Sequence, residues 1–561
     1  MRTWIWRAIL VVAVCACGPS KHSGGGGGTD GGSNNLPHTL TGITVSPTNP
    51  IVQLDLNATG AQGFAVTANY EDNTTEDVTA MATFTVANPA VGTMSGATLS
   101  IPSFASATAV VSKITANALG LTGVAQITVV AYRKTGPQQD FFFILPYNDP
   151  AGQQMKPLDF STAIPALDVF FIMDTTGSMT GEINNLKTEL NSTVIPGIQA
   201  AVANSEFGVG YHDDFPVDTY GMSPDQPFKL VQAITNSVSA VTTGVNSLTL
   251  GNGYDEPEAG IEAIYQAATG DGLAGPSPTS VAANHTGVGG VGFRTGTMPV
   301  IVPISDADSH RIAPDPGNCN DQNPDYYGAD VAAYAHSLPQ TETALANICA
   351  RVVGIAPIGN ASCSAVPYYT ALATSTGARV PPAAWDIGTR PAGCASNQCC
   401  TGQNGAGQAT DAQGLCPLVF LASTNGTGVS TNIVTGIQML TRFATFDVTD
   451  TVMGVGTDIN GNPLPTGYTT ASFIKAVMPA TYQVPPPPPT IPPPTFDATT
   501  FHGVTPGTTV GFNVDAFNDF VPVTNDAQIF QATIQVLAGG CTPLDQRTVL
   551  ILVPPNPIVV Q

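Results

Sequence analysis

The chain has few charged residues, and basic residues are the scarcest among them. Only 10% of the 561 residues are charged, with 17 Lys and Arg against 40 Asp and Glu, so the formal net charge is −23. Binding to nucleic acid needs clustered Lys and Arg to neutralise phosphates, so this balance argues against a nucleic-acid partner. The acidic excess fits a solvated surface or a cation-binding surface equally well.

The chain also lacks a hydrophobic run of membrane-spanning length. The run AILVVAVCA, which follows Arg2 and Arg7, has about nine residues and is too short to cross a bilayer as a helix. Residues 1–17 instead have the form of an export signal. Val14, Ala16 and Cys17 resemble the lipobox of bacterial lipoproteins, which implies acylation of Cys17 after cleavage; ordinary signal-peptidase cleavage at the same bond is the alternative.

A polar, glycine-rich segment, residues 18–36, follows the signal. Such a composition predicts a flexible tether. Because no other segment reaches membrane-spanning length, we expect lipid to be the only membrane anchor. The sequence therefore predicts an exported protein of the cell envelope, held at the outer membrane or cell surface.

The cysteines agree with an exported protein. The chain has 10 cysteines, and eight remain beyond Cys15 and Cys17. An even number in an exported chain predicts disulfides, although the sequence leaves their pairing open. A zinc site in the cysteine-rich segment 394–416 is disfavoured, since no His accompanies it and the spacing is irregular. The eight cysteines are Cys319, Cys349, Cys363, Cys394, Cys399, Cys400, Cys416 and Cys541.

Glycine and proline are abundant, at 58 and 47 residues, as in turn-rich β domains. Residues 37–132 alternate apolar and polar over short runs separated by turn residues, which predicts an antiparallel sandwich. Short β runs return in 446–561, where we expect a second β-sandwich with an extended proline-rich segment at 484–494. Residues 133–160 are expected to be a linker.

Between the two β regions, residues 161–445 alternate apolar strands with helical segments. The strands, such as ALDVFFIM and MPVIVPIS, are apolar on both faces, which predicts a mostly parallel sheet covered by helices on both sides. Two Gly/Pro/Cys-rich stretches, near 311–335 and 388–416, are expected to be surface insertions.

Oxygen-bearing side chains follow two of these strands and begin one helix. Asp174 ends the strand LDVFFIMD, with Thr176 and Ser178 just beyond it. Asp or Ser before a helix is usually a cap, so capping is a good alternative for this stretch taken alone. Asp306 ends a second strand, in SDADSH, and Glu258 begins a helix in DEPEAG, where it could complete a capping box.

Together these residues predict a cation site. Ligands of open α/β sheets bind at the carboxyl ends of the strands. Hard cations such as Mg²⁺ prefer oxygen ligands and usually retain waters. Neutral Thr and Ser oxygens leave the metal electrophilic enough to take a further carboxylate from a partner.

The spacing Asp174-x-Thr176-x-Ser178 resembles the metal-ion-dependent adhesion site of von Willebrand factor type A domains. GYHDDFP, DEPEAG and SDADSH resemble loops of the integrin β-subunit version of that domain. The resemblance implies a doubly wound, Rossmann-like α/β domain over 161–445. It also implies a primary site for Mg²⁺ or Mn²⁺, and a neighbouring site for Ca²⁺. The primary ligands would be Asp174, Thr176, Ser178, Glu258 and Asp306, and the neighbouring ones Asp214, Asp255 and the shared Glu258.

Two departures from the integrin β pattern affect the other cations. The family's Asn at the neighbouring site is Gly253 here, which removes a ligand. A pair of acids after the first loop becomes Gly181-Glu182, which puts a third site in doubt. Residues 37–132 separately resemble group 2 bacterial Ig-like domains, which implies a spacer.

An enzyme is the rival interpretation. A strand followed by D-x-T-G-S also resembles the phosphorylated-aspartate loop of P-type pumps and haloacid-dehalogenase-like phosphatases. That chemistry needs a positioned Lys, and none of Lys187, Lys229 and Lys475 follows a strand suitably. His212 and His310 lie near the proposed metal loops and are interpreted as hydrogen-bonding residues rather than ligands. We therefore expect no catalytic residues.

The sequence as a whole predicts a lipid-anchored surface protein. It would comprise an Ig-like β-sandwich, an α/β von Willebrand type A domain and a C-terminal β-sandwich. The expected function is cation-dependent binding of a protein partner that offers an acidic side chain. The non-enzymatic alternative is a structural surface protein whose cation only stabilises the fold.

Overall fold

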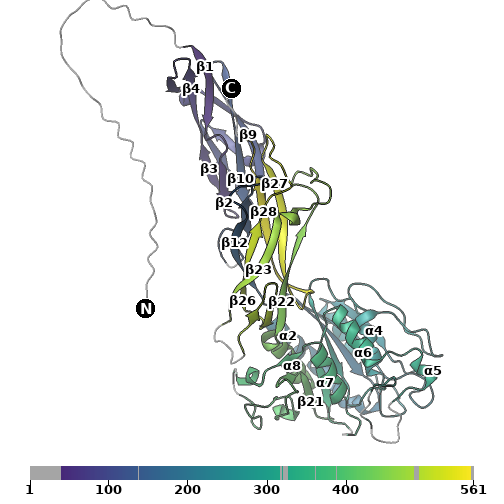
Figure 1. Ribbon diagram of the computed structural model, residues 1–561. Helices are drawn as coiled ribbons and strands as arrows, with labels where there is room; N and C mark the ends of the chain where they lie inside the picture. The colour runs from purple at the N-terminus through teal and green to yellow at the C-terminus, as the bar shows by residue number, and fades with distance from the viewer. Residues whose placement is uncertain are drawn as a thin grey trace, which may run out of the picture.

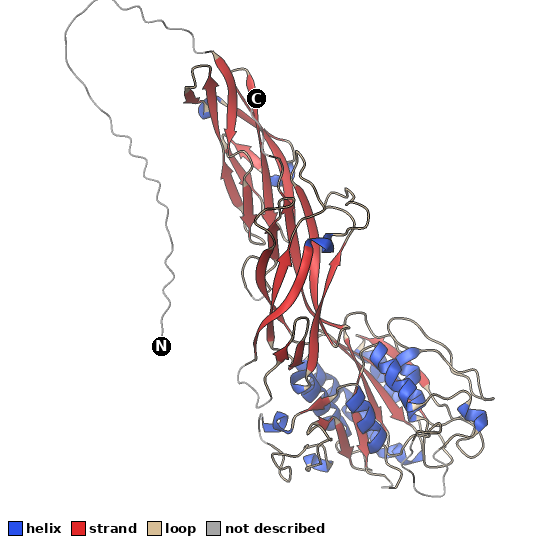
Figure 2. Ribbon diagram, viewed as in Figure 1, coloured by secondary structure: helices blue, strands red, loops and turns tan. Residues whose placement is uncertain are grey.

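The computed structural model describes residues 39–556, apart from 137, 316–318, 320–325, 360–361, 387, 389 and 486–491. The chain forms an elongated β region with an α/β domain at one end (Figures 1 and 2). The expected signal (1–17), acylated Cys17, tether (18–36) and most of the proline-rich segment lie outside the described residues. Among the described residues, no helix combines the length and apolar character needed to cross a bilayer.

The first sandwich is built from three small sheets around one apolar core. Its strands alternate buried and exposed residues, as in β1, where Ile43 and Val45 point inward. The longest pair, β9 and β10, is antiparallel, whereas β2 joins β10 in parallel. The sheets are β1 (Leu40–Ser46), β4 (Ala65–Tyr70) and β5 (Thr75–Asp77); β2 (Ile51–Leu54), β10 (Leu121–Ala131), β9 (Thr108–Ala118) and β6 (Thr83–Val86); and β3 (Gly60–Gly63), β8 (Thr98–Ile101) and β7 (Thr93–Ser95).

The second sandwich draws strands from both sides of the α/β domain, which corrects the expectation of a linker at 133–160. That segment contains β11 (Phe141–Ile144), which pairs with β28, and most of β12 (Gln154–Ser161), which pairs with β26. The α/β domain is thus an insertion within this sandwich. One sheet runs β11, β28 (Thr542–Val553), β27 (Gln528–Ala538), β22 (Phe446–Gly454), β25 (Phe501–Val504), β24 (Thr495–Phe496); the other runs β12, β26 (Thr509–Ala516), β23 (Ile474–Gln483).

The two sandwiches pack directly against each other. An apolar cluster includes Val130 and Tyr132 of the first sandwich and Phe142 and Leu550 of the second. At the same junction the Gln126 side chain donates to Asp526 at 2.9 Å and accepts from the Ala527 amide at 2.8 Å. The long strands β27 and β28 extend from this junction toward the α/β domain (Figure 1).

The α/β domain has a mostly parallel sheet with only β15 antiparallel among its described strands. All eight residues of the central strand β13 are buried, which explains its apolar composition. The sheet order is β15 (Lys229–Thr235), β14 (Ser205–His212), β13 (Leu167–Asp174), β16 (Met298–Ile304), β18 (Gly354–Pro357), β21 (Val419–Ala422), with β17 (Arg351–Val352) beside β16.

Helices cover both faces of this sheet. Gly436 of α8 contacts Val353, and Tyr369 of α7 contacts the next residue, Gly354. Successive residues of an extended chain point to opposite faces, so these two helices lie on opposite faces of the sheet. The helices are α1 (Thr180–Glu189), which continues through a π-turn (Leu190–Val194) into α2 (Ile195–Ala201), then α3 (Val238–Asn246), α4 (Gly260–Thr269), α5 (Ala329–Ala332), α6 (Leu338–Asn347), α7 (Val366–Ser375) and α8 (Val429–Phe443).

The disulfide prediction is confirmed, and four bridges use all eight of the expected cysteines. Cys349–Cys541 joins the segment after α6 to the turn between β27 and β28, so it links the α/β domain to the second sandwich. The segment 388–416 lies against edge strand β21, where Thr401 accepts a hydrogen bond from the Leu421 amide at 2.8 Å. The other bridges are Cys319–Cys363, Cys394–Cys400 and Cys399–Cys416.

Candidate metal centre

Asp174 ends β13 and is fully buried. Its Oδ1 accepts hydrogen bonds from the Thr176 amide at 2.9 Å and the Thr176 hydroxyl at 2.7 Å. Its Oδ2 accepts from the Ser305 hydroxyl at 2.7 Å. The carboxylate is therefore held by the loop that follows its own strand and by the end of β16.

The capping alternative does not describe these residues. The short helical turn after Asp174 has Thr176 at its N-cap, and α1 has Met179, and neither end has a side-chain cap hydrogen bond. Helix α4 begins after Ala259, again without a side-chain cap, so Asp255 and Glu258 do not cap it. Helix capping therefore does not explain why these oxygen-bearing side chains lie here.

Three loops meet at the carboxyl ends of β13 and β16 and the start of α4. Ser178, which is exposed, donates a hydrogen bond to Asp306 Oδ1 at 3.0 Å. The loop of Glu258 pairs with the loop after β16, since the Glu258 amide donates to the Asp308 carbonyl and the His310 amide donates to the Glu258 carbonyl, both at 2.9 Å. We call Asp174, Thr176, Ser178, Glu258 and Asp306 the primary cluster.

The negative charge of Glu258 is strongly disfavoured by its surroundings. It is 4% exposed, and its Oε2 has no hydrogen-bond partner among the described residues. Burial raises the pKa of Glu258 well above its ordinary value, and the charges of Asp174, Asp214 and Asp255 raise it further. Such a group is costly without a positive charge beside it.

The primary cluster lies along a cleft of about 320 Å³. Thr176, Ser178, Glu258 and Asp306 line this cleft, so most of the cluster faces one space. Burial, and then the Asp174 charge, raises the pKa of Asp306 to about 6. The two carboxylates and two hydroxyls that line the cleft, together with the buried Asp174, form an all-oxygen donor set, which fits Mg²⁺ or Mn²⁺.

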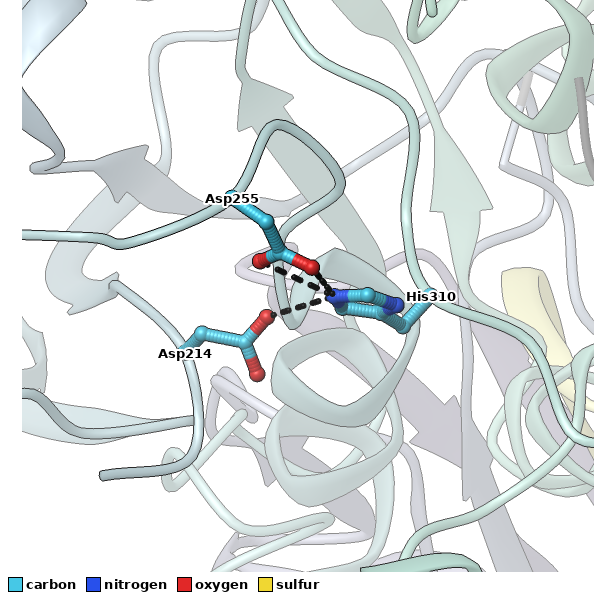
Figure 3. Close-up of side chains that lie close together, drawn as sticks. All are labelled: Asp214, Asp255 and His310. Carbon is cyan, nitrogen blue, oxygen red and sulfur yellow. Dashed lines mark hydrogen bonds and ion pairs between the residues drawn. The ribbon is translucent and has the colours of Figure 1, made fainter. Parts of the chain in front are cut away.

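Figure 3 shows a second group of polar side chains. It lies close to Glu258 of the primary cluster, because the charges of Asp214 and Asp255 raise the pKa of Glu258. The structure brings Asp214 and Asp255 together, as the sequence interpretation required, but around His310. Its Nε2 lies 3.2 Å from Asp214 Oδ2 and 3.3 Å from Asp255 Oδ2. Burial lowers the pKa of His310, but the two carboxylates outweigh burial and raise it to about 9. We call Asp214, Asp255 and His310 the neighbouring cluster.

Several buried acids around these clusters were not expected from the sequence. Glu182, 1% exposed, has a pKa raised to about 7 by burial and by the charges of Asp306 and Asp174. Asp225 accepts hydrogen bonds from the amides of Met222, Asn252 and Gly253, and so fixes the loop that leads to Asp255. No local motif marks this role of Asp225, because Asn252 and Gly253 lie 27 and 28 residues away in sequence.

Comparisons with known proteins give weak and partial similarities. No family model matches the chain. It is 24% identical over 195 residues to integrin beta-6 of Homo sapiens and equally to integrin beta-6 of Sus scrofa. These alignments cover 30% of this chain and 22% of each relative, so the chain spans less than a quarter of their length.

Among solved structures, the pilus adhesin SpaC from Lactobacillus rhamnosus GG, in its open conformation, is similar over 75% of this chain and 50% of its own. The identity is 11% and the TM-score is 0.27, which is too low to support an argument about fold or function. The chain is thus similar over about a third of its length to an integrin β subunit.

Proposed function

We propose that this chain is a lipid-anchored surface adhesion protein whose α/β domain is a von Willebrand factor type A domain. The primary cluster binds Mg²⁺ or Mn²⁺, and the cation grips an acidic side chain of a protein partner. Cys17 carries the lipid at the cell envelope, and the two sandwiches act as a spacer, the first of them Ig-like. The partial similarity to integrin beta-6 supports this proposal.

The observation that carries the proposal is that four oxygen donors from three loops line one cleft, while the fifth, Asp174, accepts a hydrogen bond from the Thr176 hydroxyl. Asp174 and Glu258 are buried, whereas Ser178 is exposed at the opening. A cation held there has protein ligands on its inner side and solvent on its outer side. Since Mg²⁺ keeps near-octahedral coordination and usually retains waters, an outer water can be replaced by a partner's carboxylate.

The types of donor in the primary cluster also support binding of a partner's carboxylate by the cation. Thr176 and Ser178 offer neutral oxygens, so the cation keeps positive charge for a further anionic ligand. Tyr254, 63% exposed, lines the same cleft and offers an apolar surface to residues that flank the partner's acid. Aromatic side chains at such positions often contribute strongly to protein interfaces.

The proposal can be tested by selecting ligands from a displayed peptide library on the immobilised full chain. Selection is done in Mg²⁺ and elution with EDTA, and Ser178→Ala is used in parallel. We expect EDTA-eluted peptides to be enriched in Asp or Glu at one position. Replacing that residue by Asn or Gln should abolish binding, and Ser178→Ala should weaken it. Ser239→Ala, on the exposed surface of α3, is the matched control.

Two outcomes would contradict adhesion through the cation. If Mg²⁺ raises the melting temperature but selected peptides bind equally in EDTA, the cation serves only the fold. If peptide binding needs Mg²⁺ but shows no preference for acids, the cation orders a loop and does not contact the partner. An Asp174-dependent phosphatase activity would favour the enzymatic alternative instead.

A further inference from the structure

The neighbouring cluster contains a nitrogen donor where an oxygen site was expected. His310 Nε2 faces Asp214 Oδ2 at 3.2 Å, Asp255 Oδ2 at 3.3 Å and Asp255 Oδ1 at 3.4 Å (Figure 3). The ligand atoms of all three side chains lie within 4.8 Å of one another. The side chains of Asp214 and His310 are fully buried and that of Asp255 is 5% exposed.

The surrounding residues orient these atoms toward one point. Asp214 Oδ1 accepts hydrogen bonds from the Phe215 amide at 2.5 Å and the Tyr327 hydroxyl at 2.8 Å. Its Oδ2 is left without a hydrogen-bond partner among the described residues, as is Asp255 Oδ2. Hydrogen bonds of this kind to the outer oxygen of a carboxylate commonly fix metal ligands.

The imidazole ring is held by ring packing, since its Nδ1 has no hydrogen-bond partner among the described residues. It packs edge-on against Tyr220, with ring centroids 5.0 Å apart, and tilted against Tyr327 at 4.5 Å. The His310 amide donates to the Glu258 carbonyl, which ties the ring to the loop of the primary cluster. His310 therefore cannot turn away without disturbing both aromatic side chains.

We propose that the neighbouring cluster is a binding site for Zn²⁺ or a similar first-row transition metal ion, with His310 Nε2, Asp214 Oδ2 and Asp255 Oδ2 as ligands. These three side chains are the group whose ligand atoms lie within 4.8 Å of one another, and a water can complete the tetrahedral coordination of an ion with three protein ligands. Asp214 and His310 are fully buried, and of the three side chains only Asp255 reaches the cleft that the primary cluster lines, so the cation stabilises the loops rather than taking a ligand from a partner.

The donor types favour this ion over Ca²⁺ and Mg²⁺. Hard cations take oxygen ligands, whereas imidazole suits Zn²⁺ and its neighbours in the first transition row.

The site can be tested by titrating the EDTA-treated full chain with Co²⁺ and recording visible absorption. The experiment is done in the Asp306→Asn variant, which impairs the primary cluster, so the outcome does not depend on the proposed adhesion function. We expect one Co²⁺ per chain with the intense absorption bands of four-coordinate Co²⁺. Zn²⁺ should displace this Co²⁺, and excess Ca²⁺ should not.

His310→Gln should remove these bands and weaken Zn²⁺ binding at least about 100-fold. His285→Gln, at an exposed histidine, is the matched control and should change nothing. Because His310 is buried, Asp255→Asn at the edge of the site provides a second variant if His310→Gln does not fold, and it should weaken Zn²⁺ binding at least about tenfold.

Two results would overturn the proposal. Bands that persist in folded His310→Gln, or a Zn²⁺ affinity that is unchanged in Asp255→Asn, would place the ion elsewhere. A chain without such bands, whose melting temperature Zn²⁺ does not change, would show that His310 is an imidazolium ion paired with the two aspartates.

Discussion

The primary and neighbouring clusters lie side by side, but they differ in donors and in access to solvent. The primary cluster presents only oxygens, and its Ser178 is exposed beside a cleft. The neighbouring cluster contains an imidazole, and the side chains of Asp214 and His310 are fully buried. An open oxygen site can exchange a water for a partner's carboxylate, whereas a closed site can only hold loops together.

Asp174→Ala is expected to cause the largest difference between the two clusters in how their metal affinities change. This change removes a ligand of the primary cluster and leaves the Thr176 amide and hydroxyl without the acceptor they share. We expect Mg²⁺ affinity to fall at least about 100-fold and the free energy of unfolding to fall by roughly 1–3 kcal/mol. Zn²⁺ binding at the neighbouring cluster should persist, as measured by calorimetric titration.

The control for this prediction is Asp519→Ala, which removes a partly exposed carboxylate of the second sandwich. It should leave both titrations unchanged. Equal Mg²⁺ affinity in Asp174→Ala and the original chain would remove Asp174 from the site.

The next-largest effect is expected in how the free energy of unfolding depends on pH. In the cation-free chain, Asp306 has a pKa raised to about 6 and Glu182 a pKa raised to about 7. The folded state therefore binds protons more tightly than the unfolded state, so stability is highest below about pH 4 and falls as pH rises toward 7. The expected loss is on the order of 3 kcal/mol from Asp306.

Urea unfolding across this pH range, in EDTA and in Mg²⁺, measures the effect. Saturating Mg²⁺ should flatten the dependence, because the cation stabilises the ionised carboxylates. Asp306→Asn should reduce it in EDTA. Stability that rises between pH 4 and 7 in EDTA would contradict the pKa directions.

A smaller effect should be confined to the neighbouring cluster. Tyr327→Phe removes the hydroxyl that donates to Asp214 Oδ1 but keeps the ring against His310. We expect Zn²⁺ affinity to fall about tenfold, with Mg²⁺ affinity at the primary cluster unchanged. Tyr220→Phe is the matched control, since the Tyr220 hydroxyl accepts from the Gly328 amide instead; an equal loss in both variants would mean that ring packing, not carboxylate orientation, matters.

The smallest expected effect comes from Ser178→Ala. Water can replace an exposed hydroxyl ligand, so Mg²⁺ affinity should fall only a few-fold, roughly 1 kcal/mol. Zn²⁺ affinity should not change. A loss as large as that of Asp174→Ala would show that Ser178 is as enclosed as the aspartate, which would remove the difference in access between the clusters.

The chain's local patterns predicted much of the primary cluster and less of the neighbouring one. Asp174, Glu258 and Asp306 follow apolar strands or precede a helix, so parallel-sheet geometry alone brings them near one another. His310 was interpreted as a hydrogen-bonding residue, and its Nε2 does lie 3.4 Å from Asp255 Oδ1. Its burial between Tyr220 and Tyr327 has no local signal, because it depends on segments far apart in sequence. The burial of Glu182 likewise has no local signal.

The fold shows the same division between local and distant information. Alternating strands marked the two β regions, and strands apolar on both faces marked the α/β domain between them. The strands β11 and β12 were placed in a linker, because they pair with β28 and β26 across the whole inserted domain. Periodicity gives the type of an element but not a partner that lies hundreds of residues away.

The difference in access between the clusters can be measured directly with Mn²⁺ bound at the primary cluster and the neighbouring cluster filled with Zn²⁺. Water-proton relaxation reports whether bound Mn²⁺ retains exchangeable waters. The account predicts strong relaxation enhancement, which falls when an EDTA-eluted acidic peptide is added and does not fall with its Asn or Gln analogue. Weak enhancement that neither peptide changes would show a closed primary site and contradict cation-mediated adhesion.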